Sequence, residues 1–334
     1  MARGCVVLSH SRAVQHDQAT MPPDTLDPDV TTRPRIGWPR LRLAGRMLLA
    51  LLFGGTAVLG GIFVFRQGAL PLIDAWLQPD AGTLSAIRRI GILLAAVTGY
   101  WAYVRLHERR HPTELKPPLL GLPLGAAGGA LMIVLPMALL FAINAYEPLL
   151  VRGASSALWG VAALIVIAAT LEELVYRGLL FRVLERTIGT GIALVVQALV
   201  FAVMHLDNLT HATAGDIVRL LVSVSLLGVL WAGLFVLTRN LWVVAAHHAA
   251  WNFTILLSGL PLSGIEDWRA LAPMQSRMVG PDWLTGGMFG PESSWLVILT
   301  TTAATIWLLR VAKRRGGFVA ASIAPTKTAV ARLP

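Results

Sequence analysis

Cysteine and charged residues are both scarce in this sequence. Among its 334 residues there is a single cysteine, Cys5, which excludes an internal disulfide framework and a zinc site built from several cysteines. Charged residues make up only 14% of the chain, whereas soluble domains carry about a quarter. Hydrophobic residues reach 55%, and the mean hydropathy is +0.66. These values indicate a polytopic membrane protein.

The N-terminal region lacks the apolar content of a folded domain. The stretch "QATMPPDTLDPDVTTRPR" is rich in Pro, Asp, Thr and Arg and cannot bury enough apolar surface to fold alone. The apolar "CVVL" near the start is too short for the core of a signal peptide. We therefore expect residues 1–42 to form a disordered cytoplasmic tail.

Long apolar runs fill the rest of the chain. A helix that crosses the hydrocarbon of a bilayer needs about 20 apolar residues. Eight candidate spans follow one another, at roughly 43–65, 88–106, 119–146, 157–181, 189–209, 216–238, 241–259 and 294–310. The sequence predicts an all-α fold, a polytopic membrane helix bundle of about eight transmembrane helices over residues 43–310, and a basic cytoplasmic tail over 311–334.

The distribution of positive charge predicts the orientation of these spans. The chain has a formal net charge of +10, which could suggest a nucleic-acid surface. With the N-terminus inside, however, Lys and Arg favour the inner segments by roughly three to one. The charge is then a topogenic signal, and we expect a plasma-membrane protein with both termini cytoplasmic, in contact with lipid and not with nucleic acid. The loop 260–293, with Trp268 and Trp283, is expected outside, resting on the membrane interface.

Charged residues interrupt the fourth span in the stretch "ATLEELVYRGLLF". A charge at this depth is costly and usually faces the interior of a bundle with a partner. Glu173 and Arg177 are four residues apart, on one helical face and in the favourable order for an ion pair. Glu172 points about 100° away, has no such partner and is free to act as a general base.

Further polar residues occur in two later spans. His205 follows Phe201 by four residues in "FAVMHL", and His248 and Asn252 share one face of the seventh span in "AAHHAAWNF". His247 points elsewhere, and Asn252 favours His248 as the residue that faces a site. Alone, each motif has a plain structural explanation, since a Glu–Arg pair can simply join helices and a buried His can simply pack. Together, in three separate spans, they indicate one polar site.

In this order, EExxxR, FxxxH and HxxxN resemble the CPBP family of intramembrane proteases. That family includes CAAX prenyl endoproteases and bacterial homologues associated with bacteriocin immunity. The resemblance covers residues 155–258, with "EELVYRGLLF", "FAVMHL" and "LWVVAAHHAAWNF" as its anchors. Two positions depart from many relatives, because Tyr176 stands where they have Phe and Trp251 where they have a second Asn.

The resemblance implies a glutamate-dependent endopeptidase that hydrolyses a peptide bond in or at the membrane. Carried over by position, Glu172 is the catalytic glutamate, and His205 helps it to position and activate a water. His248 and Asn252 stabilise the oxyanion, while Glu173 and Arg177 are supporting residues. The substrate is expected to be a peptide or protein, with a lipid-linked one among the alternatives.

Three questions stay open at the level of the sequence. The family has been described as metalloproteases, and zinc bound by Glu172, His205 and His248 is one alternative, but the sequence contains no HExxH motif and a metal-free mechanism accounts for Asn252 equally well. An ion-coupled transporter or proton relay also places Glu, His and Arg in membranes. A catalytically inactive immunity or scaffold protein of the same family would keep the same motifs.

Overall fold

The computed structural model describes residues 38–322 except 210 and 266. Most of the expected N-terminal tail, residues 1–37, lies outside the described part, as do residues 323–334 of the basic tail. Residues 38–42, which were expected in the N-terminal tail, already belong to the first helix.

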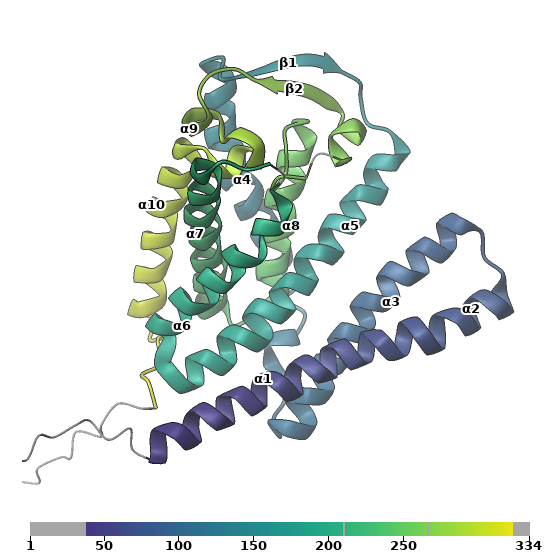
Figure 1. Cartoon of the computed structure of the whole chain (residues 1–334), viewed down its shortest axis with the longest axis vertical. Helices are drawn as coiled ribbons and strands as arrows, with labels where there is room; N and C mark the ends of the chain where they lie inside the picture. Colours follow the sequence, from purple (N-terminus) through teal and green to yellow (C-terminus); the bar gives the residue numbers. More distant parts are fainter. Residues whose placement is uncertain (1–37, 210, 266, 323–334) are drawn as a thin grey trace, which may run out of the picture. The chain divides into compact units, whose positions relative to one another are not determined.

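Helices dominate the described part of the chain, so the predicted all-α membrane bundle is confirmed (Figure 1). The longer α-helices are α1 (Trp38–Val64), α2 (Leu70–Leu77), α3 (Ala81–Ala102), α4 (Gly121–Ala142), α5 (Ser156–Glu173), α6 (Arg182–Met204), α7 (Ala214–Thr238), α8 (Leu241–Leu257) and α10 (Trp295–Arg314). The short α9 (Asp282–Thr285) lies in the loop before α10. Three π-helical segments continue neighbouring helices, namely η1 (Phe65–Ala69), η2 (Tyr103–His107) and η4 (Leu174–Phe181), and short 3-10 turns lie at η3 (Thr113–Leu115), η5 (Leu206–Asn208), η6 (Asp267–Leu271), η7 (Gly287–Phe289) and η8 (Pro291–Ser293).

Six helical segments of the described chain are long and apolar enough to cross a membrane. One of them, residues 156–208, has 53 residues and contains both the fourth and the fifth expected spans. The seventh expected span corresponds to α8, an apolar helix of 17 residues. The apolar helices therefore follow the order of the expected spans, but the fourth and fifth expected spans belong to one continuous helical segment.

A two-stranded antiparallel sheet between distant segments was not expected from the sequence. The third span was predicted to reach residue 146, but α4 ends at Ala142, and β1 (Tyr146–Val151) then pairs antiparallel with β2 (Met274–Met278). The backbone groups of a loop need hydrogen-bond partners, and the two strands supply them to each other. The hydroxyl of Tyr146 also donates to the carbonyl oxygen of Thr285 at 2.7 Å. The loop 260–293 is thereby joined to the helix bundle.

Glycines let α4 approach α8 very closely. A Cβ atom added to Gly125 would lie 2.6 Å from the carbonyl oxygen of Val243, and one added to Gly129 would lie 2.0 Å from that of His247. Both pairs are four residues apart on their helices, as in the GxxxG arrangement of membrane helices. This contact holds the backbone of α8 in place directly beside His248.

The long helical segment that begins with α5 turns back on itself at Gly189. Its φ of 79° and ψ of 162° are non-helical, and a positive φ of this size favours glycine. A Cβ atom here would lie 2.8 Å from the backbone nitrogen of Ala321. The backbone N–H of Thr190 donates to the Val319 carbonyl at 3.0 Å, so the segment after α10 packs at this break.

Candidate active site

The polar site is built where α5 passes into the π-helical segment η4. The change occurs directly after Glu173, and π-helical turns are frequently found at functional sites. Glu173 is completely buried, whereas 35% of the Glu172 side chain is accessible. The two adjacent glutamates therefore occupy different surroundings, as their 100° separation on a helix predicts.

Glu173 and Arg177 form an ion pair that is entirely shielded from solvent. The Arg177 Nη1 atom lies 3.0 Å from Glu173 Oε1, and neither side chain has accessible surface. Arg177 also donates through Nη2 to the carbonyl oxygen of Gly228 on α7 at 3.2 Å. Its guanidinium lies 4.6 Å from the ring centre of Phe201 on α6. The pair thus connects η4 with α6 and α7.

His248 lies between the two glutamates. Its Nδ1 is 2.9 Å from Glu173 Oε1 and its Nε2 is 3.9 Å from Glu172 Oε2. A carboxylate can only accept, so the neutral ring carries its proton on Nδ1 and presents Nε2 as an acceptor. The ring stacks on Trp231, with centroids 3.7 Å apart and planes inclined by 22°. His248 is therefore fixed both in orientation and in tautomer.

His205 caps the C-terminal end of α6. Its Nδ1 lies 2.8 Å from the carbonyl oxygen of Phe201, four residues earlier, and its ring packs on the Phe201 ring with centroids 4.4 Å apart. Because a carbonyl only accepts, Nδ1 carries the proton here too, and Nε2 is left as the acceptor. These two contacts with Phe201 explain why the phenylalanine and the histidine are four residues apart in the FxxxH motif.

All four residues expected to be catalytic line one small cavity of about 70 Å³. Its wall comes from α5, the end of α6 with η5, α8 and the loop after α8. The lining residues are Ile165, Ala168, Glu172, His205, Asn208, His248, Asn252, Leu262, Ser263, Ile265 and Trp268. The volume suits a few water molecules, and its polar groups can bind them. The two supporting residues, Glu173 and Arg177, lie behind this wall.

Several atoms at the site are buried without a hydrogen-bond partner. They include Oε2 of Glu172, Oε2 of Glu173 and Oδ1 of Asn252. A buried polar atom without a partner costs about 1–3 kcal/mol, so such atoms are uncommon unless a function requires them. Their concentration here indicates a site that is arranged for a ligand or reactant and not for stability.

The donors do not form a metal-binding group. Among the described residues, no three His, Cys, Asp or Glu side chains are close enough together to hold a metal ion. The zinc set that the sequence left open, formed by Glu172, His205 and His248, therefore does not fit as ligands in this arrangement.

His247 belongs to a different environment from its neighbour. Its Nδ1 accepts a hydrogen bond from Trp231 Nε1 at 3.1 Å, and it does not line the cavity. Trp231 thus contacts both histidines, one through its ring face and the other through its N–H. Nothing in the sequence pointed to Trp231, because a tryptophan within an apolar helix gives no distinguishing signal.

The loop after α8 also lines the cavity, which was not predicted from the sequence. Trp268 lines the cavity together with Ser263, whereas Trp283 is 54% exposed. The interfacial position expected for both tryptophans stays a prediction. The loop is fastened by Glu292, which is 3% exposed and accepts from Ser263 Oγ at 2.6 Å and from Trp251 Nε1 at 3.2 Å. Burial raises the pKa of the Glu292 carboxyl. Glu292 was not identified from the sequence, because its partners Ser263 and Trp251 lie 29 and 41 positions away.

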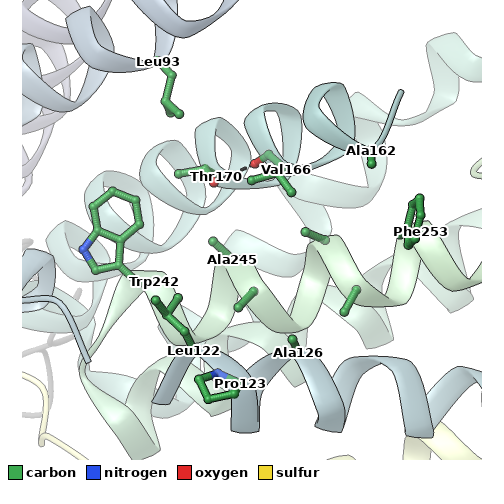
Figure 2. Close-up of a pocket in the computed structure, with 13 residues that line it drawn as sticks. Leu93, Leu122, Pro123, Ala126, Ala162, Val166, Thr170, Trp242, Ala245 and Phe253 are labelled. Carbon is green, nitrogen blue, oxygen red and sulfur yellow. Dashed lines mark hydrogen bonds between the residues drawn. The ribbon is translucent and has the colours of Figure 1, made fainter. Parts of the chain in front are cut away.

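A larger, apolar hollow lies on another face of the same helices. It has a volume of about 520 Å³ and is lined by residues of α3, α4, α5 and α8, with Trp242 at one end and Phe253 at the other (Figure 2). Figure 2 also shows Thr170 donating its hydroxyl to the carbonyl oxygen of Val166, at 2.7 Å, so this polar group is satisfied within α5. The apolar groove is lined by no charged side chain, but α5 and α8 line both this groove and the small polar cavity.

The part of the chain that contributes most of the site resembles a known protein family. Residues 154–254 match the model of a family described as type II CAAX prenyl endopeptidase Rce1-like. The match includes Glu172, His205, His248 and Asn252, and it confirms the CPBP resemblance that the three motifs suggested. No curated protein matches the chain.

Proposed function

Because residues 154–254 match the family of Rce1-like CAAX endopeptidases, we propose that this membrane protein hydrolyses a peptide bond with a water activated by Glu172. The single observation that carries the proposal is the shared cavity of Glu172, His205, His248 and Asn252. Three separate helices contribute these side chains, so their gathering is not a consequence of sequence proximity.

In the proposed reaction, Glu172 takes a proton from water as the oxygen attacks the substrate carbonyl carbon. The unprotonated Nε2 of His205 accepts a hydrogen bond from the second O–H of the water, which stays on the oxygen, and so orients it. Asn252 donates its side-chain N–H to the oxyanion of the tetrahedral intermediate. Glu172 then passes the proton to the leaving nitrogen as the C–N bond breaks. A positioned base typically contributes 10²–10⁴-fold to the rate.

His248 has a more specific part in this scheme. In its neutral form, Nε2 is an acceptor and helps to hold the water beside Glu172, 3.9 Å away. It can donate to the oxyanion only after Nε2 takes up a proton. The Glu173 carboxylate on Nδ1 would then offset the positive charge, as an orienting carboxylate does for a catalytic histidine. Glu173 thereby supports both functions.

The substrate we propose is a membrane-associated peptide with an apolar or lipid-linked portion. The groove of about 520 Å³ offers space for such a portion, and it lies on the two helices that carry Glu172 and His248. Residues of α5 and α8 that line it, such as Thr170 and Ala249, are within two positions of these side chains.

The test compares new peptide termini in membranes that contain the wild type or Glu172→Gln. We expect a set of termini to disappear in the variant, while its Tm stays close to that of the wild type. Glu147→Gln is a matched control, because Glu147 lies in β1, outside the cavity, and pairs with Arg277. If Glu172→Gln yields the same termini as the wild type, the assignment of the base is wrong.

The alternatives give different outcomes in the same samples. If the protein is an inactive immunity or scaffold protein, the wild type and Glu172→Gln samples contain the same peptide termini. A transporter or proton relay requires a gradient across sealed liposomes, whereas a protease releases peptides in detergent.

We further propose that both chain ends face the cytoplasm. The described C-terminal segment contacts two arginines that the charge pattern assigns to the cytoplasmic side, which supports this topology. Arg239 donates to the Gly317 carbonyl at 2.6 Å, and the carbonyl of Arg186 accepts from Ser322 at 2.7 Å.

A membrane-impermeant maleimide tests this topology on intact cells, since Cys5 is the only cysteine. We expect no labelling of Cys5. We expect labelling of Ser155→Cys in a Cys5→Ser background, because Ser155 is exposed and precedes the first residue of α5, at the opposite end of that helix from η4. Labelling of Cys5 from outside contradicts the topology.

A further inference from the structure

A second polar cavity, of about 210 Å³, lies where α1, η2 and the start of α6 meet. It shares no lining residue with the candidate active site. Its lining residues are Leu43, Arg46, Met47, Ala50, Tyr103, His107, Glu108, Val183, Arg186 and Thr187. Those of α1 recur at spacings of three and four, as do those of α6, so each helix presents one face to the cavity.

The lining of this cavity combines apolar and charged side chains. Leu43, Met47, Ala50 and Val183 supply apolar surface, while the cationic side chains of Arg46 and Arg186 supply positive charge. The cavity is therefore amphiphilic, and it lies near the end of a membrane span, since α1 begins at Trp38.

The negative charge at this cavity is already neutralised. Glu108 pairs with Arg186 at 2.8 Å, with Arg182 at 2.9 Å and with Arg110 at 2.6 Å. Arg46, by contrast, is exposed, and no described residue forms a hydrogen bond or ion pair with it. The charge that remains for a ligand is positive, so the cavity favours an anion.

We propose that this cavity binds the phosphate headgroup of an anionic phospholipid. A lipid is favoured by the surface that continues from the cavity along α1, where Leu48, Leu49, Leu52 and Phe53 are each at least 51% exposed. Acyl chains can lie on this face while the phosphate contacts Arg46 and Arg186. Basic pockets between membrane helices at the cytoplasmic side are a known kind of site for anionic headgroups.

The experiment measures lipid binding to the detergent-purified full chain by native mass spectrometry. We expect saturable binding of phosphatidylglycerol and at least tenfold weaker binding of phosphatidylcholine. Arg46→Gln should weaken phosphatidylglycerol binding about fivefold, the typical effect of one basic residue near an anionic surface. Folding is not at risk, because Arg46 is exposed and has no partner among the described residues. The matched control is Arg66→Gln in η1, about 30 Å further along the same helical segment.

Each outcome decides for or against the site. Phosphatidylglycerol binding that is about fivefold weaker in Arg46→Gln but unchanged in Arg66→Gln supports it. Equal binding of both lipids, or equal loss in both variants, shows only a general lipid shell and overturns the proposal. Inorganic phosphate that competes as well as the lipid would assign the cavity to a soluble phosphate instead. Catalytic activity is not the readout, so the result is independent of the proposed hydrolase.

Discussion

The ring of His248 stacks on the indole of Trp231, with centroids 3.7 Å apart. This contact comes from α7, a helix that carries none of the residues that line the cavity. Together with the bond from Nδ1 to Glu173, it allows the imidazole only one orientation toward Glu172.

Replacement of Trp231 tests this orientation. Trp231→Leu keeps an apolar side chain but removes the stacking surface and the donor to His247. We expect kcat to fall by about 10-fold to 100-fold with a smaller change in KM, since misplacement of a catalytic group can cost about 10² in rate. Trp231→Phe retains an aromatic ring and should recover most of the rate. Equal kcat in both variants would show that stacking has no part in catalysis.

The buried pair of Glu173 and Arg177 should matter first for stability. Arg177→Met leaves the Glu173 charge without its cation in a dry environment, so we expect a loss of about 3–5 kcal/mol in unfolding free energy. The double variant Glu173→Gln/Arg177→Met removes both charges and should recover part of that loss. The measurement is a denaturation curve in detergent, and wild-type stability for Arg177→Met would contradict the pairing.

The cluster around Glu114 should make stability depend on pH. Burial alone would raise the pKa of Glu114, but the hydrogen bonds from Arg110 and the nearby charge of Arg182 lower it to about 2. The Arg110 Nη2 and Arg182 Nη1 atoms lie 2.6 and 2.9 Å from its Oε1. A lowered folded-state pKa means that Glu114 contributes stability above its ordinary pKa of about 4.5, and that this contribution is lost as the pH falls toward 2.

Glu114→Gln should therefore lower Tm at pH 7 and lose less stability than the wild type between pH 5 and pH 3. Thermal unfolding in detergent across this range provides the measurement. Glu147→Gln is the control, because its pair with Arg277 is partly exposed and such pairs contribute about 1 kcal/mol or less. Parallel pH curves for the wild type and Glu114→Gln would show that the cluster does not stabilise the fold in this way.

Glu292 should control the loop that forms one wall of the cavity. Glu292→Ala leaves the N–H of Trp251 and the hydroxyl of Ser263 without their acceptor, which costs about 1–3 kcal/mol and releases the loop. We expect faster tryptic cleavage after Arg277, which is already exposed in β2.

Glu292→Gln gives the complementary result. An amide can accept from Trp251 and donate to Ser263 Oγ, so the loop stays in place. Because burial raises the pKa of Glu292, its charged form costs stability as the pH rises, and the neutral glutamine should be at least as stable as the wild type at pH 8. Rapid proteolysis of Glu292→Gln would instead show that the charge itself holds the loop.

Local patterns explain what could be predicted from the sequence. Apolar length is sufficient to identify membrane helices, and a spacing of four places Glu173 beside Arg177 and His248 beside Asn252 on one face. The three motifs also selected the four residues that the structure brings to one cavity. Their catalytic roles stay predictions, since the geometry supports them without testing them.

Contacts between distant segments account for what was missed. Trp231 and Glu292 act through partners on other helices or in the loop, and nothing in their own neighbourhood indicates those partners. The pairing of β1 with β2 joins residues more than 100 positions apart, and two such short strands leave only a weak pattern in the sequence. That Trp268 lines the cavity was missed for the same reason, because η6 contacts α5 only through the fold of the loop.

The break at Gly189 decides where His205 can be. In an unbroken helix, His205 would stand about 50 Å from Glu172, whereas here both line a single cavity. Gly189, which has no side chain, therefore determines whether Glu172 and His205 can meet in one cavity. Inactivating substitutions should consequently accumulate in two regions, one around the cavity and another around this hinge, where a Cβ atom would collide with Ala321.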